Sequence, residues 1–126
     1  MTKALVRHMR DKGGPRYRVL IFWCPGCAAF RPRGSGLHAL PVFGETSPKW
    51  DWNGDLERVT LSPSTRTSYK YHNGGDVIEE VCHSFLKGGV FEFLGDCTHE
   101  LKNQKVALPD LPEWVERMFD GNEVGS

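Results

Sequence analysis

The chain has 126 residues, of which 39% are hydrophobic and 25% are charged. This length suits one domain with a single hydrophobic core and excludes two independent cores. Sixteen basic and sixteen acidic residues give a formal net charge of zero, so the chain lacks the positive charge that attracts proteins to nucleic acid. We therefore expect a single domain over residues 1–126 and no nucleic-acid partner.

The two ends of the chain differ in charge. Residues 1–16 form a basic stretch, and residues 115–126 contain the end of a predicted helix and an acidic tail. We expect the basic stretch to fray as an N-terminal arm outside a core of residues 17–114. No apolar signal segment follows the basic start, and no run approaches the roughly 18 apolar residues of a membrane span. The sequence therefore predicts a cytoplasmic protein with no membrane partner.

Signals for β-strands dominate the chain. The segment RYRVLIFW (16–23) is β-branched and aromatic and follows the turn signal KGGP. Only residues 111–120 have helical spacing, with Pro112 near the start. The sequence predicts a mostly β protein, a small antiparallel sheet built from hairpins with a short C-terminal helix. Further strands are expected at 37–43, 57–62, 77–86, 90–96 and 104–108, with Gly-, Pro- and Ser-rich connections that include 62–68 and 72–76.

Gly88-Gly89 predicts the two-residue turn of a hairpin. Counting back from this turn places His83 opposite Leu94. Because side chains alternate across a strand, His83 and Asp96 fall on one face as diagonal neighbours, with backbones roughly 7–8 Å apart. Cys82 falls on the opposite face. The hairpin therefore offers one set of functional side chains on each face.

The segment WCPGC carries Cys24 and Cys27 at the C-x-x-C spacing directly after a predicted strand. This knuckle lets two thiolates hold one tetrahedral zinc ion. The sequence has no second C-x-x-C, so Cys82 and Cys97 are the candidates to complete the set, unless Cys82 is a small core residue and Cys97 an incidental thiol. A redox pair of the thioredoxin type would need a following helix, which the next residues do not predict. The fourth ligand stays open among Cys97, His99 and His38.

His83 and Asp96 on one face form the base and the orienting carboxylate of a hydrolytic triad. Ser62 and Ser64 are the candidate nucleophiles, because they lie two residues apart on one side of an extended segment. The simpler interpretation of Ser-Pro-Ser is an ordinary turn. His99 is a rival for the base or a metal ligand. A metallohydrolase with a metal on His83, Asp96 and His99 is a further interpretation.

Four segments in fixed order carry a resemblance to a known family: FWCPGC, WDWNGDLERVTLSPS, CHSFLKGGVFEFLGDCTHEL and LPDLPEW. From Tyr17 to Trp114 the chain resembles a family of small phage and bacterial proteins. Some members are encoded in operons for bacterial ubiquitin-like conjugation. The resemblance implies a serine peptidase that trims a ubiquitin-like protein or releases it from its targets.

The resemblance also implies roles for individual residues. It makes Cys24 and Cys27 metal-binding candidates, but the family has serine as well as cysteine at the position of Cys97, which weakens that residue as a ligand. Val59 stands where the family more often has proline, a change that leaves the following hydroxyls in place. The catalytic residues that the resemblance implies are Ser62 or Ser64 as nucleophile, His83 as base, and Asp96 and His99 as supporting members.

Three functions are consistent with these patterns. The first is a zinc-stabilised serine hydrolase, a peptidase acting on the C-terminal tail of a bacterial ubiquitin-like protein or on its conjugates. The second is a non-catalytic zinc-ribbon-like module that binds protein or nucleic acid through Trp50 and Trp52, residues equally well explained as packing aromatics. The third is the metallohydrolase. The resemblance favours the first, and we expect its substrate to be an extended tail that pairs with an exposed strand edge.

Overall fold

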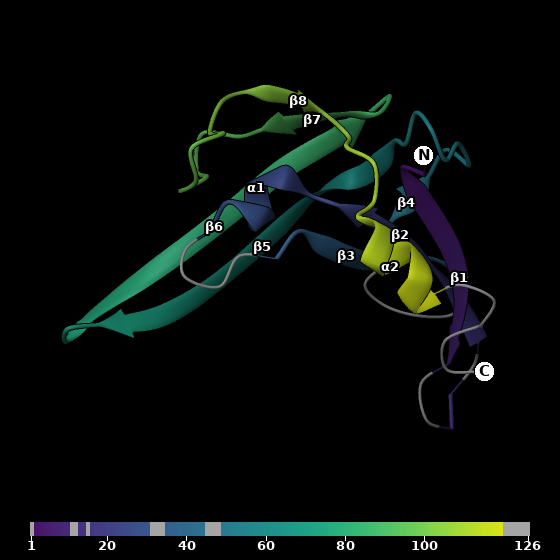
Figure 1. The fold of residues 1–126 in the computed structure, drawn as a ribbon, viewed down its shortest axis with the longest axis horizontal. Helices are drawn as coiled ribbons and strands as arrows, with labels where there is room; N and C mark the ends of the chain where they lie inside the picture. The colour runs from purple at the N-terminus through teal and green to yellow at the C-terminus, as the bar shows by residue number, and fades with distance from the viewer. Residues whose placement is uncertain (1, 11–12, 15, 31–34, 45–48, 120–126) are drawn as a thin grey trace.

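The computed structural model describes residues 2–10, 13–14, 16–30, 35–44 and 49–119. Its strands form two antiparallel sheets, one of three strands and one of five (Figure 1). The prediction of a mostly β protein with a short C-terminal helix is confirmed. No helix in the described ranges is long and apolar enough to cross a membrane.

The three-stranded sheet has the order β1-β2-β3. Residues 4–10, which we expected to fray with the basic arm, form β1 and pair with β2 along their whole length. The sequence did not indicate this strand because basic residues interrupt it. One face of an antiparallel sheet can be exposed and accept such residues, while Ala4 of the same strand is buried in the core. The strands are β1 (Ala4–Arg10), β2 (Arg16–Trp23) and β3 (Leu37–Gly44).

The five-stranded sheet has the order β4-β5-β6-β7-β8. Its two longest strands, β5 and β6, form a hairpin that extends past the rest of the molecule at the left of Figure 1. The hairpin turns at Gly74 and Gly75, whose φ angles of 60° and 94° suit glycine. The strands are β4 (Asp51–Trp52), β5 (Leu61–Asn73), β6 (Asp76–Lys87), β7 (Val90–Phe93) and β8 (Lys105–Ala107).

Strand β5 corrects two sequence-based expectations. Residues 62–68 were expected to connect strands, but they belong to β5, where exposed and half-buried residues alternate. The alternation of Thr and Tyr with polar residues supports such a half-buried strand. Residues 57–60 were expected to begin a strand and do not. The Asp55 carboxylate accepts the N–H groups of Glu57 and Arg58 at 2.8 and 2.9 Å, which folds this segment into a turn.

The two sheets pack through one hydrophobic core, with β2 at its centre. Four consecutive residues of β2, Val19 to Phe22, are at most 3% exposed. Leu20 and Phe22 face the five-stranded sheet and contact its core, including Phe91. Val19 and Ile21 face the other way, against the C-terminal segment that holds α2 (Glu113–Phe119). Burial on both faces explains why β2 is a continuous apolar run rather than an alternating one.

The predicted hairpin turn at Gly88-Gly89 is confirmed. Lys87 pairs with Val90, and the N–H of Leu94 donates to the carbonyl of His83 at 2.9 Å. The turn also packs on the segment before β5, because the N–H of Gly89 donates to the Val59 carbonyl at 2.9 Å. This register determines which side chains of β6 face the core and which face outward.

We predict that Gly89→Ala destabilises the protein more than Gly74→Ala. Both glycines have positive φ, and this conformation costs a residue with a Cβ about 1–2 kcal/mol. A Cβ at Gly89 would also lie 3.1 Å from the Glu57 carbonyl oxygen, whereas at Gly74 it would meet nothing within 4 Å. We expect the free energy of unfolding to fall by about 1–2 kcal/mol for Gly74→Ala and about 2–4 kcal/mol for Gly89→Ala. Urea denaturation measures both losses, and equal losses would contradict the close packing at Gly89.

Candidate functional site

A bulge in β5 positions the candidate nucleophile. The register between β5 and β6 shifts between Leu61 and Thr65, so that three residues of β5 face a single residue of β6. Pro63 lies inside this bulge, where its missing N–H costs no ladder hydrogen bond. After the bulge, Arg66 lies opposite His83. Ser64, two residues earlier, is therefore on the same face as His83 and diagonal to it.

Ser64, His83 and Asp96 form a continuous chain of hydrogen bonds. Ser64 Oγ lies 3.0 Å from His83 Nε2. His83 Nδ1 lies 3.0 and 3.1 Å from the two carboxylate oxygens of Asp96. With Nδ1–H donating to the carboxylate, Nε2 is free to accept the hydroxyl proton of Ser64. These distances are those of a nucleophile, a base and an orienting carboxylate.

The chain of hydrogen bonds lies at the protein surface. The side chain of His83 is 24% exposed and that of Asp96 is 47% exposed. Arg66, whose position was not singled out from the sequence, places its Nε 3.9 Å from Asp96 Oδ2. Its spacing of two residues from Ser64 was the available signal, because that spacing puts both side chains on one face. An exposed ion pair of this kind contributes little to the stability of the fold.

The two candidate serines differ in their surroundings. Ser62 is exposed and pairs with Asp51 of β4. Of these two serines, Ser64 has the hydroxyl that contacts a histidine among the described residues. The backbone at Ser64 is also held by Trp50, whose indole N–H donates to the Ser64 carbonyl at 3.5 Å. The geometry therefore separates two residues that spacing alone left equivalent.

Trp50 and Trp52 contribute to packing. Both are half-buried and pack against the core. The indole N–H of Trp52 donates to the Asp55 carbonyl at 3.1 Å. These contacts agree with the interpretation of both side chains as packing aromatics.

His99 lies apart from the outward face of His83. It is 7% exposed, and its ring packs against Phe93, with the ring centroids 4.9 Å apart. Phe93 pairs with Ser84, so its side chain points to the core face of the sheet. Burial lowers the pKa of His99 below its usual value. The structure therefore does not bring His99 together with His83 and Asp96, the group in which the sequence placed it as a triad member or third metal ligand.

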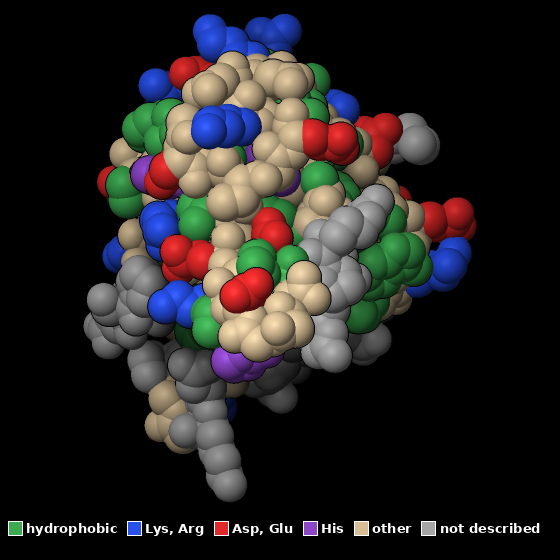
Figure 2. Space-filling view, turned by 90° about the vertical axis from the view of Figure 1, so that its left-hand side faces the viewer, with side chains coloured by type: hydrophobic (Ala, Val, Ile, Leu, Met, Phe, Trp, Pro, Cys, Tyr) green, Lys and Arg blue, Asp and Glu red, His purple; other side chains and the backbone are tan. Residues whose placement is uncertain are grey.

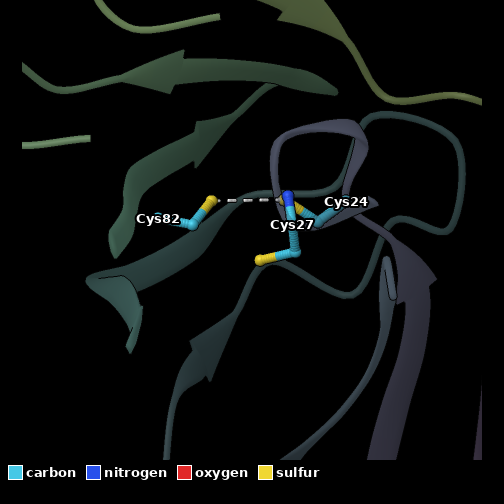
Figure 3. Close-up of side chains that lie close together, drawn as sticks. All are labelled: Cys24, Cys27 and Cys82. Atoms are coloured by element: carbon cyan, nitrogen blue, oxygen red, sulfur yellow. Dashed lines mark hydrogen bonds between the residues drawn. The ribbon is translucent and has the colours of Figure 1, made fainter. Parts of the chain in front are cut away.

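Three cysteines gather on the core face, as Figure 3 shows. The sulfurs of Cys24, Cys27 and Cys82 all lie within 4.8 Å of one another, and all three residues are buried. Cys24 and Cys27 flank the start of the short helix α1 (Pro25–Ala28), where the N–H of Cys27 points at Cys24 Sγ at 3.5 Å. Cys82 reaches them from β6, with its sulfur 3.7 Å from that of Cys24. Three buried cysteines this close together can bind a metal ion.

The three thiols of the cluster also influence one another's protonation. Hydrogen bonds from Cys27 and Cys82 hold the pKa of the Cys24 thiol far below its usual value. The matching hydrogen bond to Cys24 raises the pKa of Cys27 to about 12 and raises that of Cys82 as well. Cys24 is therefore the thiol of the three that loses its proton most readily.

Two histidines border the cysteine cluster. His38 Nε2 lies 3.4 Å from Cys27 Sγ, although His38 stands outside the set with all ligand atoms within 4.8 Å. His99 Nδ1 accepts the N–H of Leu101 at 3.2 Å, so Nε2 carries the proton of the neutral ring. That N–H is buried without a hydrogen-bond partner, against the Gly26 turn between the first two cysteines. A ring nitrogen that carries a proton cannot coordinate a metal, so His38 rather than His99 is the candidate for a fourth ligand.

Cys97 does not join the cluster. The N–H of His83 donates to Cys97 Sγ at 3.3 Å, and the thiol donates to the His83 carbonyl at 3.2 Å. The structure therefore brings together three of the four cysteines predicted as metal ligands and places Cys97 elsewhere. Strand β7 ends at Phe93, so beyond that residue the two hydrogen bonds of Cys97 hold the backbone of His83, the candidate base.

A hydroxyl, an imidazole and a carboxylate in hydrogen-bonded sequence define the arrangement of the serine hydrolases, which recurs on unrelated folds. The chain belongs to the family of bacterial ubiquitination-like system serine proteases (BubE), whose model matches residues 2–94. Neither the curated proteins nor the solved structures compared with the chain gave a match. The matched residues begin before β1 and include both serines, His83 and the three clustered cysteines, and they end before Asp96.

We predict that Cys97 stabilises the fold through the His83 backbone. Cys97→Ala leaves a buried N–H without an acceptor, so the free energy of unfolding should fall by about 1–3 kcal/mol. Cys97→Ser keeps a donor and an acceptor at this position and should lose less. Chemical denaturation of the two variants under reducing conditions measures the difference. A serine variant less stable than the alanine variant would contradict the role of these hydrogen bonds.

Proposed function

We propose that this protein is a serine peptidase that cleaves at the C-terminal tail of a bacterial ubiquitin-like protein, either in its precursor or in its conjugates. The observation that carries the proposal is the hydrogen-bonded series Ser64–His83–Asp96. Membership of the BubE family supports both the serine mechanism and the ubiquitin-like partner. The surface position of the site suits a substrate that is itself a folded protein with an accessible tail.

The reaction follows from the three side chains. His83 Nε2 removes the proton of Ser64 as Oγ attacks the carbonyl carbon of the substrate, and Asp96 stabilises the resulting imidazolium through Nδ1–H. His83 then gives the proton to the leaving amine, so that the peptide bond breaks and an acyl group stays on Ser64. A water molecule, activated by the same histidine, hydrolyses the acyl-enzyme and restores the serine.

The backbone around Ser64 supplies the candidate donor for the negative oxygen of the intermediate. Pro63 has no N–H, and the alternation of the ladder directs the N–H of Thr65 toward Ser84 of β6. The N–H of Ser64 itself is therefore the candidate within this segment. A backbone donor next to the nucleophile is a common component of an oxyanion hole.

We also propose that the cysteine cluster binds zinc as a structural metal, held by Cys24, Cys27 and Cys82 with His38 as the fourth ligand. The bound ion would supply a closed, four-coordinate crosslink rather than a site for substrate. Cys24 and Cys27 lie at α1, which follows β2, and Cys82 lies on β6 of the other sheet, so the ion would connect the two sheets. Because Cys82 directly precedes His83, this connection would restrict the strand that carries the candidate base.

We predict that Ser64→Ala abolishes cleavage and that Ser62→Ala does not. The test follows cleavage of a bacterial ubiquitin-like protein bearing a C-terminal extension by mass spectrometry. Loss of the nucleophile should reduce the rate by at least about a thousandfold. Ser62, whose hydroxyl contacts no histidine in the described structure, serves as the matched control and should retain activity within about threefold. Cleavage that persists in Ser64→Ala, or is lost only in Ser62→Ala, would refute the assignment.

We predict that the purified, tag-free protein contains about one zinc ion per chain. Cys24→Ser and Cys82→Ser should lose most of this metal and lower the thermal stability, because the buried thiolate and its crosslink are removed together. Cys97→Ser is the matched control and should keep its zinc. Elemental analysis of the reduced proteins measures the content. Metal-free wild-type protein, or a Cys97→Ser variant that alone loses its zinc, would contradict the proposed ligand set.

A further inference from the structure

Among the described residues, one edge of β5 has no strand beside it over most of its length. Strand β5 pairs with β6 from Leu61 to Asn73, but on its other side β4 pairs only with Leu61 and Ser62. Beyond Ser62, no strand among the described residues occupies that side. The uncovered edge begins at the candidate nucleophile and follows the hairpin that projects from the molecule (Figure 1).

The hairpin geometry identifies the backbone groups that point away from β6. A two-residue turn at Gly74-Gly75 makes Asn73 and Asp76 a hydrogen-bonded pair, and such pairs alternate along an antiparallel ladder. The residues that belong to non-hydrogen-bonded pairs direct their N–H and C=O groups outward. These residues of β5 are Arg66, Ser68, Lys70 and His72.

The partners of these residues on β6 confirm the alternation. Val81, opposite Ser68, accepts the N–H of Thr98 at 2.9 Å. His83, opposite Arg66, accepts the N–H of Leu94 at 2.9 Å and donates its own N–H to Cys97 Sγ. Both residues thus direct their backbone groups away from β5. By the same geometry, Arg66 and Ser68 direct theirs away from β6.

We propose that the outer edge of β5 from Arg66 to His72 is the docking strand for the substrate tail, which adds to the sheet as an antiparallel strand. This inference rests on the proposed peptidase function and extends it to the mode of recognition. An added strand would find outward N–H and C=O groups at every second residue, which is the requirement of β-augmentation. Ser64 stands at the end of this edge, with its hydroxyl on the face of His83.

The antiparallel direction determines which part of the substrate binds. β5 runs from Ser64 toward His72, so an antiparallel tail runs from His72 toward Ser64. The residues that precede the scissile bond therefore lie along the edge, and the scissile carbonyl arrives at the nucleophile. Every pairing in both sheets is antiparallel, and this arrangement is slightly the more stable per residue.

The side chains along this edge favour recognition of the main chain over a particular sequence. Arg66 lies near Asp96, and Lys70 is opposite Glu79, so both cations already have acidic neighbours. Figure 2, viewed from the side of the hairpin tip, shows basic and acidic side chains interspersed rather than a surface of one sign. We therefore expect the backbone hydrogen bonds, rather than charge, to supply most of the affinity.

The test uses labelled peptides of alternating alanine and serine that end in a boronic acid. The boron accepts Ser64 Oγ as His83 takes the hydroxyl proton, so the peptide reports on binding before the scissile position. Residues of an extended strand advance about 3.3 Å each, and four residues therefore reach about as far as Ser68, whereas eight reach His72. Binding to the wild-type protein is measured by fluorescence polarisation for both lengths.

Two proline variants test the edge. Ser68→Pro removes an outward N–H that does not pair with β6, so the hairpin should survive, and thermal melting checks this. It should weaken both peptides about three- to tenfold, the effect of losing one backbone hydrogen bond. His72→Pro is the matched control, and it should weaken only the eight-residue peptide. Equal binding of the four-residue peptide to wild type and to a folded Ser68→Pro variant would overturn the proposal.

Modified peptides test the same edge on the unaltered protein. N-methylation of successive peptide residues should alternate between weakened and unchanged binding, because only every second N–H faces β5. Binding without this alternation would overturn the proposal even if Ser68→Pro unfolds. Labelling of Ser64 by a small fluorophosphonate, which has no peptide, tests the serine mechanism separately and should be equal in wild type and both proline variants. A boronate that fails to bind while Ser64 is labelled refutes the docking alone, and absence of labelling refutes the proposed function and the docking with it.

Discussion

The alternation of side chains along β6 is the constraint on which the rest of the structure depends. Cys82 points into the core and completes the cysteine cluster, while His83, the next residue, points outward to Ser64 and Asp96. One strand thus carries a residue of the cysteine cluster on its core face and a residue of the candidate catalytic site on its outward face. A slip of one residue in its register would exchange the two side chains and destroy both sites at once. The glycine turns at both ends of β6 and the two flanking strands hold this register.

The two sites have opposite requirements for solvent, and the sheet separates them. The cysteine cluster is buried, where the proposed metal would be shielded from solvent. The hydroxyl, imidazole and carboxylate are partly exposed, where a protein tail can reach them. Cys97 connects the two regions, because its sulfur is buried while its hydrogen bonds hold the backbone of His83. The stability of the core and the position of His83, the candidate base, are therefore linked through neighbouring residues.

The bulge at residues 62–64 is the second local feature with a functional consequence. It ends regular pairing with β6 for three residues and carries Ser64 to the diagonal position from His83. β-Bulges often occur at sheet edges and beside active sites, where they redirect a side chain. The pairing of β4 with β5 also ends at Ser62. The edge of β5 that no described strand covers therefore begins beside Ser64. A short edge strand and a bulge together thus leave space for an additional strand.

Local patterns in the sequence predicted much of this arrangement. The run in β2, the Gly88-Gly89 turn and the helical spacing near Pro112 depend on neighbouring residues, and the structure agrees with each. The hairpin count also placed His83 and Cys82 on opposite faces, because period-two alternation needs only a correct turn. The C-x-x-C spacing predicted that Cys24 and Cys27 lie close together, because the two residues are separated by a single short turn.

The remaining features depended on contacts between distant residues. The sequence could not distinguish Ser62 from Ser64, because the bulge that separates them exists only when β5 pairs with β6. It assigned residues 4–10 to a frayed arm, since their charge obscured an alternation that has meaning only beside β2. It also named Cys97 and His99 as candidate metal ligands, although one holds a strand backbone and the other packs against the Gly26 turn between Cys24 and Cys27. Local spacing by itself determined the turns, the faces and the cysteine pair. The choice between the candidate nucleophiles and among the candidate ligands required the tertiary structure, because side chains far apart in sequence meet only when the strands pair and the sheets pack.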